Sequence, residues 1–222
     1  MHRRHFILTT SAGALAGICA PAAMAQLAGK AQAAATRPQV IVVLGDSLSA
    51  EYGLARGTGW VALLEKRLAQ EKIAATVVNA SVSGETTSGG RSRLPALLAQ
   101  HRPSLVVIEL GGNDALRGLP LKNTEENLSW MVQTAQKAGA KVLLVGIQVP
   151  PNYGADYTQR FAATFATVAK AHKAGLVPFL LKGVADGPDP TRLFQPDRIH
   201  PRAEAQPQML ANVWPELHKL LR

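Results

Sequence analysis

The sequence feature that most constrains the fold is a series of short apolar runs that alternate with amphipathic stretches. The first run, residues 40–44, is continuously apolar and mostly β-branched, which predicts a strand buried on both faces of a parallel sheet. The same reasoning predicts further strands at residues 74–80, 105–110, 142–147 and 176–181. Helical spacing of apolar residues predicts helices at residues 60–69, 92–100, 123–138, 157–174 and 203–221. Strict alternation implies an α/β fold: a parallel sheet of about five strands covered by helices on both faces.

The first 25 residues have the composition of an export signal. Arg3 and Arg4 form a basic start that resembles a twin-arginine signal, and Ala23-Met24-Ala25 offers a cleavage site of the small-x-small type. A general secretion signal is the alternative. We therefore expect residues 1–25 to be a signal peptide, residues 26–37 a flexible tail, and residues 38–222 one domain of a periplasmic or secreted protein.

Composition narrows the functional classes further. The only cysteine, Cys19, lies in the predicted leader, so the mature chain would have neither a disulfide nor a thiol nucleophile. The net charge is +9, but the basic residues form no run of five or more, which argues against a nucleic-acid-binding arm and favours weak attraction to anionic lipid surfaces. No histidine and carboxylate cluster has metal-binding spacing. We expect no metal, no other cofactor and a monomer.

Small polar residues follow the predicted strands, where open α/β sheets bind their ligands. Ser47 comes just after the first run, and taken alone it fits a turn or helix cap as well as a nucleophile. Acyl transfer also needs a base, a group that orients the base, and donors aimed at the oxyanion. His200 can be the base, and Asp197, one short turn earlier, can accept a hydrogen bond from its other ring nitrogen. The backbone N–H groups of Ser47 and Gly84 and the side-chain amide of Asn113 can be the donors.

Other residues of these stretches have structural interpretations. Asp46 and Asp114 are more consistent with loop bracing than with acid–base chemistry, and Thr87 is expected to form hydrogen bonds within a loop at residues 81–90. Pro201 suits the first position of the closing helix, where it would hold His200 at the rim of the site. Pro215 is expected to bend the same helix.

Four stretches together resemble the blocks of the GDSL, or SGNH, hydrolase superfamily. They are G-D-S-L-S at residues 45–49, S-G-E-T at 83–86, G-G-N-D at 111–114 and D-x-x-H-P at 197–201. They occur in the family's order and span nearly the whole mature chain. The resemblance implies a three-layer α/β/α, flavodoxin-like sandwich with a nucleophile, an acid and a base at Ser47, Asp197 and His200. It also implies an oxyanion hole formed by Ser47, Gly84 and Asn113.

The resemblance further implies the reaction. Members cleave carboxylic ester and thioester bonds of small-molecule substrates through an acyl-enzyme, with arylesterase, lysophospholipase and acyl-CoA thioesterase activities. Glu51 and Arg198 stand where relatives often have glycine, and we expect these departures to affect substrate preference more than catalysis. Two alternatives stay open: a carbohydrate O-acetyl esterase on the same scaffold, and a non-catalytic protein that binds acyl chains or lipid. The absence of a G-x-S-x-G elbow argues against a typical α/β-hydrolase.

Overall fold

The sheet of the computed structural model, which describes residues 39–222, has five strands in the order β2-β1-β3-β4-β5. Every neighbouring pair is parallel. The strands are β1 (Gln39–Gly45), β2 (Ala75–Asn79), β3 (Leu105–Glu109), β4 (Lys141–Val145) and β5 (Gly175–Val177). The predicted signal peptide and tail lie outside the described residues.

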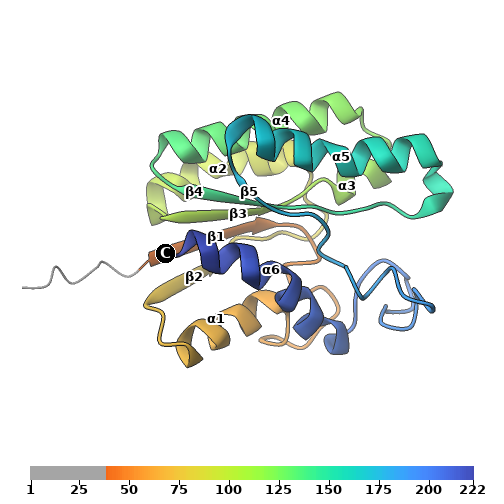
Figure 1. Cartoon of the computed structure of the whole chain (residues 1–222), viewed down its shortest axis with the longest axis horizontal. Helices are drawn as coiled ribbons and strands as arrows, with labels where there is room; N and C mark the ends of the chain where they lie inside the picture. The colour runs from red at the N-terminus through yellow and green to blue at the C-terminus, as the bar shows by residue number, and fades with distance from the viewer. Residues whose placement is uncertain (1–38) are drawn as a thin grey trace, which may run out of the picture. The chain divides into compact units, whose positions relative to one another are not determined.

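Helices cover both faces of this sheet, as Figure 1 shows. Helices α1 and α6 pack together on one face, while α2, α4 and α5 cover the other. Their bounds are α1 (Trp60–Gln70), α2 (Thr87–His101), α3 (Gly112–Leu116), α4 (Leu121–Lys137), α5 (Ala155–His172) and α6 (Gln206–Leu220), with 3₁₀ turns η1 (Pro151–Tyr153) and η2 (Ala203–Ala205). The prediction of a three-layer α/β/α fold is confirmed.

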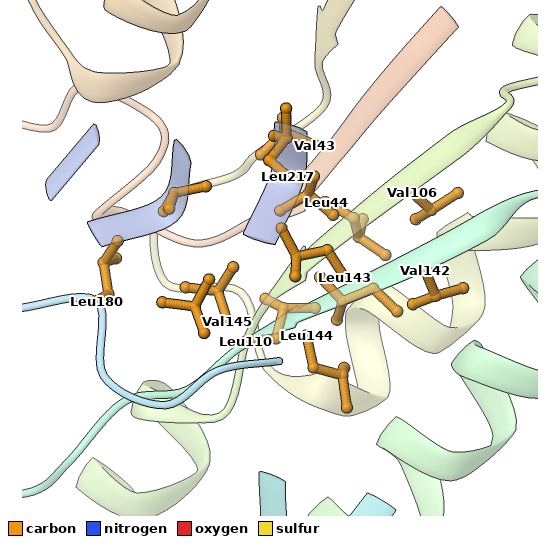
Figure 2. Close-up of a cluster of buried hydrophobic side chains, with 14 of the residues drawn as sticks. Val43, Leu44, Val106, Leu110, Val142, Leu143, Leu144, Val145, Leu180 and Leu217 are labelled. Carbon is orange, nitrogen blue, oxygen red and sulfur yellow. The ribbon is translucent and has the colours of Figure 1, made fainter. Parts of the chain in front are cut away.

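The apolar runs form the core. The side chains of Ile41, Val42, Val43 and Leu44 in β1 are fully buried, and all of β3 is buried. Figure 2 shows part of this core, in which side chains of β1 and β4 gather with Leu217 of α6. Full burial of one such side chain stabilises the fold by about 1.5–3 kcal/mol relative to exposure. The core thus fixes the sheet and leaves its carboxyl edge to carry the polar loops.

Helix α2 begins earlier than predicted, within the expected loop at residues 81–90. The side chain of Thr86 caps the helix by accepting a hydrogen bond from the N–H of Gly89 at 3.3 Å. Gly90 serves packing, since a Cβ there would lie 2.3 Å from the side chain of Leu110. Close contact with the sheet therefore outweighs the weak helix propensity of glycine.

Other boundaries also differ from the predictions. Strand β5 ends at Val177, because Pro178 follows it and has no N–H for the ladder. The short helix α3 replaces a predicted loop. Helix α6 starts only at Gln206 and contains Pro215, where the expected bend stays a prediction. The prediction that Pro201 starts this helix is wrong: the residue pairs with Phe194 in an isolated antiparallel bridge.

None of the helices within residues 39–222 is long and apolar enough to cross a membrane.

Candidate active site

Ser47 lies in the turn after β1, at the edge where the carboxyl ends of β1, β2 and β3 meet. The chain bends sharply here, since the N–H of Ala50 donates to the carbonyl oxygen of Asp46 at 2.9 Å. Gly45 permits this bend: a Cβ on it would lie 2.7 Å from the side chain of Ser49. The residue before the turn must therefore be glycine for Ser47 to reach its position.

Ser47, His200 and Asp197 lie in one line of hydrogen bonds. The distance from Ser47 Oγ to His200 Nε2 is 2.8 Å, and His200 Nδ1 lies 2.7 Å from Asp197 Oδ2. Because the ionised carboxylate can only accept, Nδ1 carries the proton in neutral histidine, and Nε2 is left to accept from the serine hydroxyl. The structure thus brings the three predicted residues together in the arrangement that activates a serine nucleophile.

Asp197 is held by the turn in which it lies. Its Oδ1 accepts hydrogen bonds from the N–H groups of Ile199 at 2.9 Å and His200 at 3.0 Å. Partial desolvation alone would raise the pKa of Asp197, but the hydrogen bonds from His200 and Ile199 outweigh it and lower the pKa to about 2. Asp197 therefore stays ionised beside the imidazole over the range in which enzymes work.

Two residues that the sequence analysis did not single out hold the histidine in place. The ring of Tyr52 packs on the imidazole of His200, with 4.3 Å between ring centroids. Gln195 donates through its side chain to the carbonyl oxygen of Tyr52 at 2.9 Å, and through its backbone N–H to that of His200 at 2.8 Å. The sequence blocks do not reveal these partners, because Tyr52 lies far from His200 in the chain and the side chain of Gln195 acts through Tyr52.

The three predicted oxyanion donors follow β1, β2 and β3: Ser47 and Gly84 lie in turns, and Asn113 lies in α3. Within residues 39–222, the backbone N–H groups of Ser47 and Gly84 donate to no protein acceptor. Gly84 has a φ of 79°, which favours glycine. Arg117 donates to the carbonyl oxygen of Gly84 at 2.9 Å and so links this loop to the end of α3. The two free N–H groups are available to a ligand.

Asn113 is anchored from the buried side by Asp46. Its side-chain N–H₂ group donates one hydrogen bond to Asp46 Oδ2 at 3.1 Å, which fixes the amide nitrogen and leaves its second N–H for another acceptor. Asp46 Oδ1 accepts from the N–H of Leu48 at 3.0 Å. The expectation that Asp46 braces a loop agrees with these contacts, and the braced group includes a predicted oxyanion donor.

Glu109, at the end of β3, was not among the predicted site residues. It is fully buried, and its Oε2 accepts from Ser49 Oγ at 2.7 Å and from the N–H of Asp46 at 3.4 Å. Burial first, and the charge of Asp46 second, raise the pKa of Glu109 well above its usual value. Burial likewise raises the pKa of Asp46 to about 6, with its hydrogen bonds and the charge of His200 opposing the shift. The one sequence signal that could have identified Glu109 is its position, as a carboxylate at the end of an apolar strand.

Asp114 braces the start of α2. Its carboxylate accepts from the N–H of Thr87 at 2.8 Å and from the hydroxyls of Thr87 and Thr124. The carboxylate is buried and lies at the N-terminus of a helix, where negative charge is stabilised. Asp114 thus joins the loop of Gly84 to the loop of Asn113, as expected for a bracing residue.

Glu51 and Arg198 both adopt positive φ, of 60° and 58°. That conformation is the one in which glycine is favoured, so a glycine at these positions in relatives has a backbone explanation. The carboxylate of Glu51 accepts from the N–H groups of Gly57 at 3.0 Å and Gly59 at 2.7 Å and so braces the loop before α1. Their influence on substrate preference stays a prediction.

In the part of the chain that the structure describes, no three His, Cys, Asp or Glu side chains are placed to hold a metal ion together. That the reaction needs no metal also stays a prediction.

Comparisons with known proteins agree with this geometry. Residues 43–206 match the GDSL-like Lipase/Acylhydrolase family. The chain is 54% identical over 183 residues to "Esterase TesA" of Pseudomonas aeruginosa, covering 82% of this chain and 90% of that protein. It is 43% identical over 173 residues to "Thioesterase 1/protease 1/lysophospholipase L1" of Escherichia coli K12, covering 78% and 80%.

A solved structure described as "Crystal Structure of TesA" superposes with a TM-score of 0.79 at 53% identity, covering 82% of this chain and 99% of that chain. The residues that match the family include all four sequence blocks, at residues 45–49, 83–86, 111–114 and 197–201. The chain belongs to the GDSL-like lipase and acylhydrolase family.

Proposed function

We propose that this protein hydrolyses carboxylic esters and thioesters through an acyl-enzyme on Ser47, with His200 as the base and Asp197 as the group that orients it. Membership of the family makes the chain an esterase that acts on small-molecule esters. The observation that carries the residue roles is the continuous hydrogen-bonded line from Asp197 through His200 to Ser47, with distances of 2.7 and 2.8 Å.

The reaction follows from the positions of these groups. Ser47 Oγ attacks the acyl carbonyl carbon while His200 Nε2 takes the hydroxyl proton, and Asp197 stabilises the resulting imidazolium. The tetrahedral oxyanion accepts hydrogen bonds from the N–H groups of Ser47 and Gly84 and from the Asn113 amide. When the tetrahedral intermediate collapses, the bond between the acyl carbon and the leaving oxygen or sulfur breaks. The alcohol or thiol leaves with the proton from His200, and the acyl group stays on Ser47.

Water then completes the cycle. His200 removes a proton from the water as it attacks the acyl-Ser47 ester, and the same donors stabilise the second oxyanion. Collapse of this intermediate releases the carboxylic acid and returns the proton to Ser47. Bonds and protons balance over the two halves, so no further group is needed.

The relatives suggest the substrate range. One is named an esterase and another a thioesterase and lysophospholipase, so we propose acyl-CoA thioesters, lysophospholipids and aryl esters as substrates. The basic start of the chain and its small-residue cleavage site support export to the periplasm or beyond. We further propose that the protein acts as a monomer, and that its positive net charge favours weak contact with anionic lipid.

A partition experiment tests the acyl-enzyme. Methanol and water compete for a common acyl-Ser47 intermediate, so the ratio of methyl ester to free acid should be the same whether the substrate is a p-nitrophenyl ester or the thioester of the same acid. A ratio that depends on the leaving group would mean that water attacks the substrate directly, and would overturn the covalent route.

Matched variants test the residue. Ser47→Ala should lose hydrolysis of both substrates, whereas Ser83→Ala, an exposed serine of the neighbouring loop, should retain it. Acetylated sugars tested beside longer acyl esters distinguish the proposed activity from a carbohydrate O-acetyl esterase. Absence of turnover on every ester would instead indicate a non-catalytic binding protein.

A further inference from the structure

The large apolar side chains that are exposed to solvent lie on the loops that carry the site. Within residues 39–222 they are Tyr52, Val82, Leu116, Leu119 and Ile199, here called the apolar rim. Leu119 is 36% exposed and Tyr52 is 50% exposed, so each leaves much of its surface in water. Single exposed apolar residues are ordinary, but their restriction to one set of loops is not.

The apolar rim comes from several segments that are joined to the residues of the predicted site. Tyr52 packs on His200, and Ile199 immediately precedes that histidine. Val82 lies in the loop of Gly84, which Arg117 links to α3 and thereby to the segment that carries Leu116 and Leu119. Because these apolar side chains come from separate segments, we expect them to contact a broad apolar surface better than a single narrow ligand.

Two basic residues of this face have no acidic partner within residues 39–222. Arg117 and Arg198 are exposed, adjoin Leu116 and Ile199 in sequence, and form no ion pair with any described residue. Three acidic residues of the same loops accept hydrogen bonds from donors of the protein. They are Glu51 with two backbone N–H groups, Glu85 with Arg93, and Asp197 with His200.

We propose that the apolar rim, with Arg117 and Arg198, docks the protein on the surface of an anionic phospholipid membrane, with the mouth of the site facing the lipid. Apolar side chains that enter the interface and cations that meet anionic headgroups are the two features of peripheral membrane binding. The inference deepens the proposed function, and rests on it for one consequence only: a docked mouth would receive acyl esters directly from the lipid surface.

Vesicle sedimentation of the full chain carrying Ser47→Ala measures docking without turnover. The protein should bind vesicles of phosphatidylglycerol and phosphatidylcholine more tightly than vesicles of phosphatidylcholine alone, and added salt should weaken the difference. In this background Leu116→Ser combined with Leu119→Ser should weaken binding to the anionic vesicles roughly tenfold, because two apolar side chains are lost from the contact.

Arginine substitutions provide a matched comparison. Arg198→Gln should weaken binding about fivefold, the order expected for one basic residue near an anionic surface. Arg102→Gln is the control, since Arg102 is also exposed and also has positive φ, at 44°, but precedes β3 at the opposite edge of the sheet. It should bind as the parent does. Circular dichroism melting curves of all variants verify that they fold.

The outcomes separate this inference from the proposed function. Equal binding to both vesicle types, or equal losses for Arg198→Gln and Arg102→Gln, would overturn the docking surface, while hydrolysis of a soluble short ester by the wild-type protein would leave the esterase proposal intact. Selective vesicle binding without hydrolysis of any ester would support the docking surface and overturn the esterase proposal. A solution dimer that Leu116→Ser and Leu119→Ser convert to a monomer would show that the rim binds a second copy, and would also overturn lipid docking.

Discussion

The two sides of Ser47 treat carboxyl groups in opposite ways. On the open side, the side chain of Asp197 is 37% exposed, and hydrogen bonds from His200 and Ile199 lower its pKa to about 2. On the closed side, Asp46 is 2% exposed and Glu109 is fully buried, and burial raises the pKa of both. The same chemical group is thus kept charged on the open side of Ser47, whereas its pKa is raised on the closed side.

The difference corresponds to the charges that the proposed reaction creates. A negative Asp197 stabilises the imidazolium that forms when His200 takes a proton. A second negative charge behind the proposed oxyanion donors would repel the developing oxyanion, so the raised pKa of Glu109 favours the transition state. The open side therefore holds a charged carboxylate, and the closed side holds the proposed donors in position with as little charge as possible.

Substitution of Asp197, on the open side, should have the largest effect on turnover. Asp197→Asn keeps the shape but cannot hold the same histidine tautomer, so kcat should fall by roughly a thousand- to ten-thousand-fold with a small change in KM. Asp189→Asn is the control, because Asp189 braces a similar turn through Thr191 without contacting the site. Steady-state kinetics on a p-nitrophenyl ester measure both. An equal loss in the two variants would mean that Asp197 acts only as a turn former.

Asn113→Ala removes a proposed oxyanion donor that is anchored to Asp46 on the closed side. The kcat should fall by about a hundred- to a thousand-fold, because the interaction is made mainly in the transition state. The loss should be equal for short and long p-nitrophenyl esters. A rise in KM confined to the long ester, with kcat unchanged, would show instead that the substitution deforms the loop beside Leu116.

Asp46→Asn tests whether the closed side acts through Asn113. An asparagine can accept from Leu48 N–H or from the Asn113 amide, but not from both, so Asn113 loses its anchor or the turn loses its brace. We expect kcat to fall about ten- to a hundredfold, less than when the donor itself is removed. In the Asn113→Ala background the same change should cost at most about twofold. Additive losses would show that Asp46 acts elsewhere.

Glu109→Gln should have the smallest effect on turnover, with kcat at neutral pH within about threefold of the wild type, since glutamine resembles the protonated acid. Its effect should appear in stability. Because the folded state raises the pKa of Glu109, the wild type is favoured at low pH and loses stability as pH rises above the usual value of 4.5.

Urea denaturation measures this pH dependence. Between about pH 5 and about pH 8, the free energy of unfolding of the wild type should fall relative to that of Glu109→Gln, which has no such titration. A pH dependence that is identical in the two proteins would mean that Glu109 ionises normally, and the contrast between the two sides of Ser47 would then rest on Asp46 alone.

The sequence was sufficient to predict what depends on local pattern. Continuous apolar runs identified the strands because both faces of the sheet are buried, and the spacing of Asp197 and His200 indicated a turn in which they meet. Glu109 was missed, although it lies in a predicted strand, because its role depends on contacts with Asp46 and Ser49 that form only when β3 pairs with β1. Tyr52 was missed because a long-range contact brings it to His200, and Gln195 was missed because its side chain acts through Tyr52.

Helix starts show the same division. The glycines after Thr86 have low helix propensity, but Thr86 caps the helix, Asp114 braces its start, and Gly90 allows close contact with Leu110. The helix position assigned to Pro201 failed because a bridge to Phe194 holds that segment extended. Local preference predicted these residues incorrectly wherever tertiary packing decided their conformation.

Covalent labelling with a fluorophosphonate tests the central claim, that Ser47 is the activated nucleophile between these two sides. Mass spectrometry of the digested protein should find one adduct, on the peptide that contains Ser47, and His200→Ala should slow its formation at least about a hundredfold because the base is lost. Labelling of another serine in the wild type, or undiminished labelling in folded Ser47→Ala, would contradict the account.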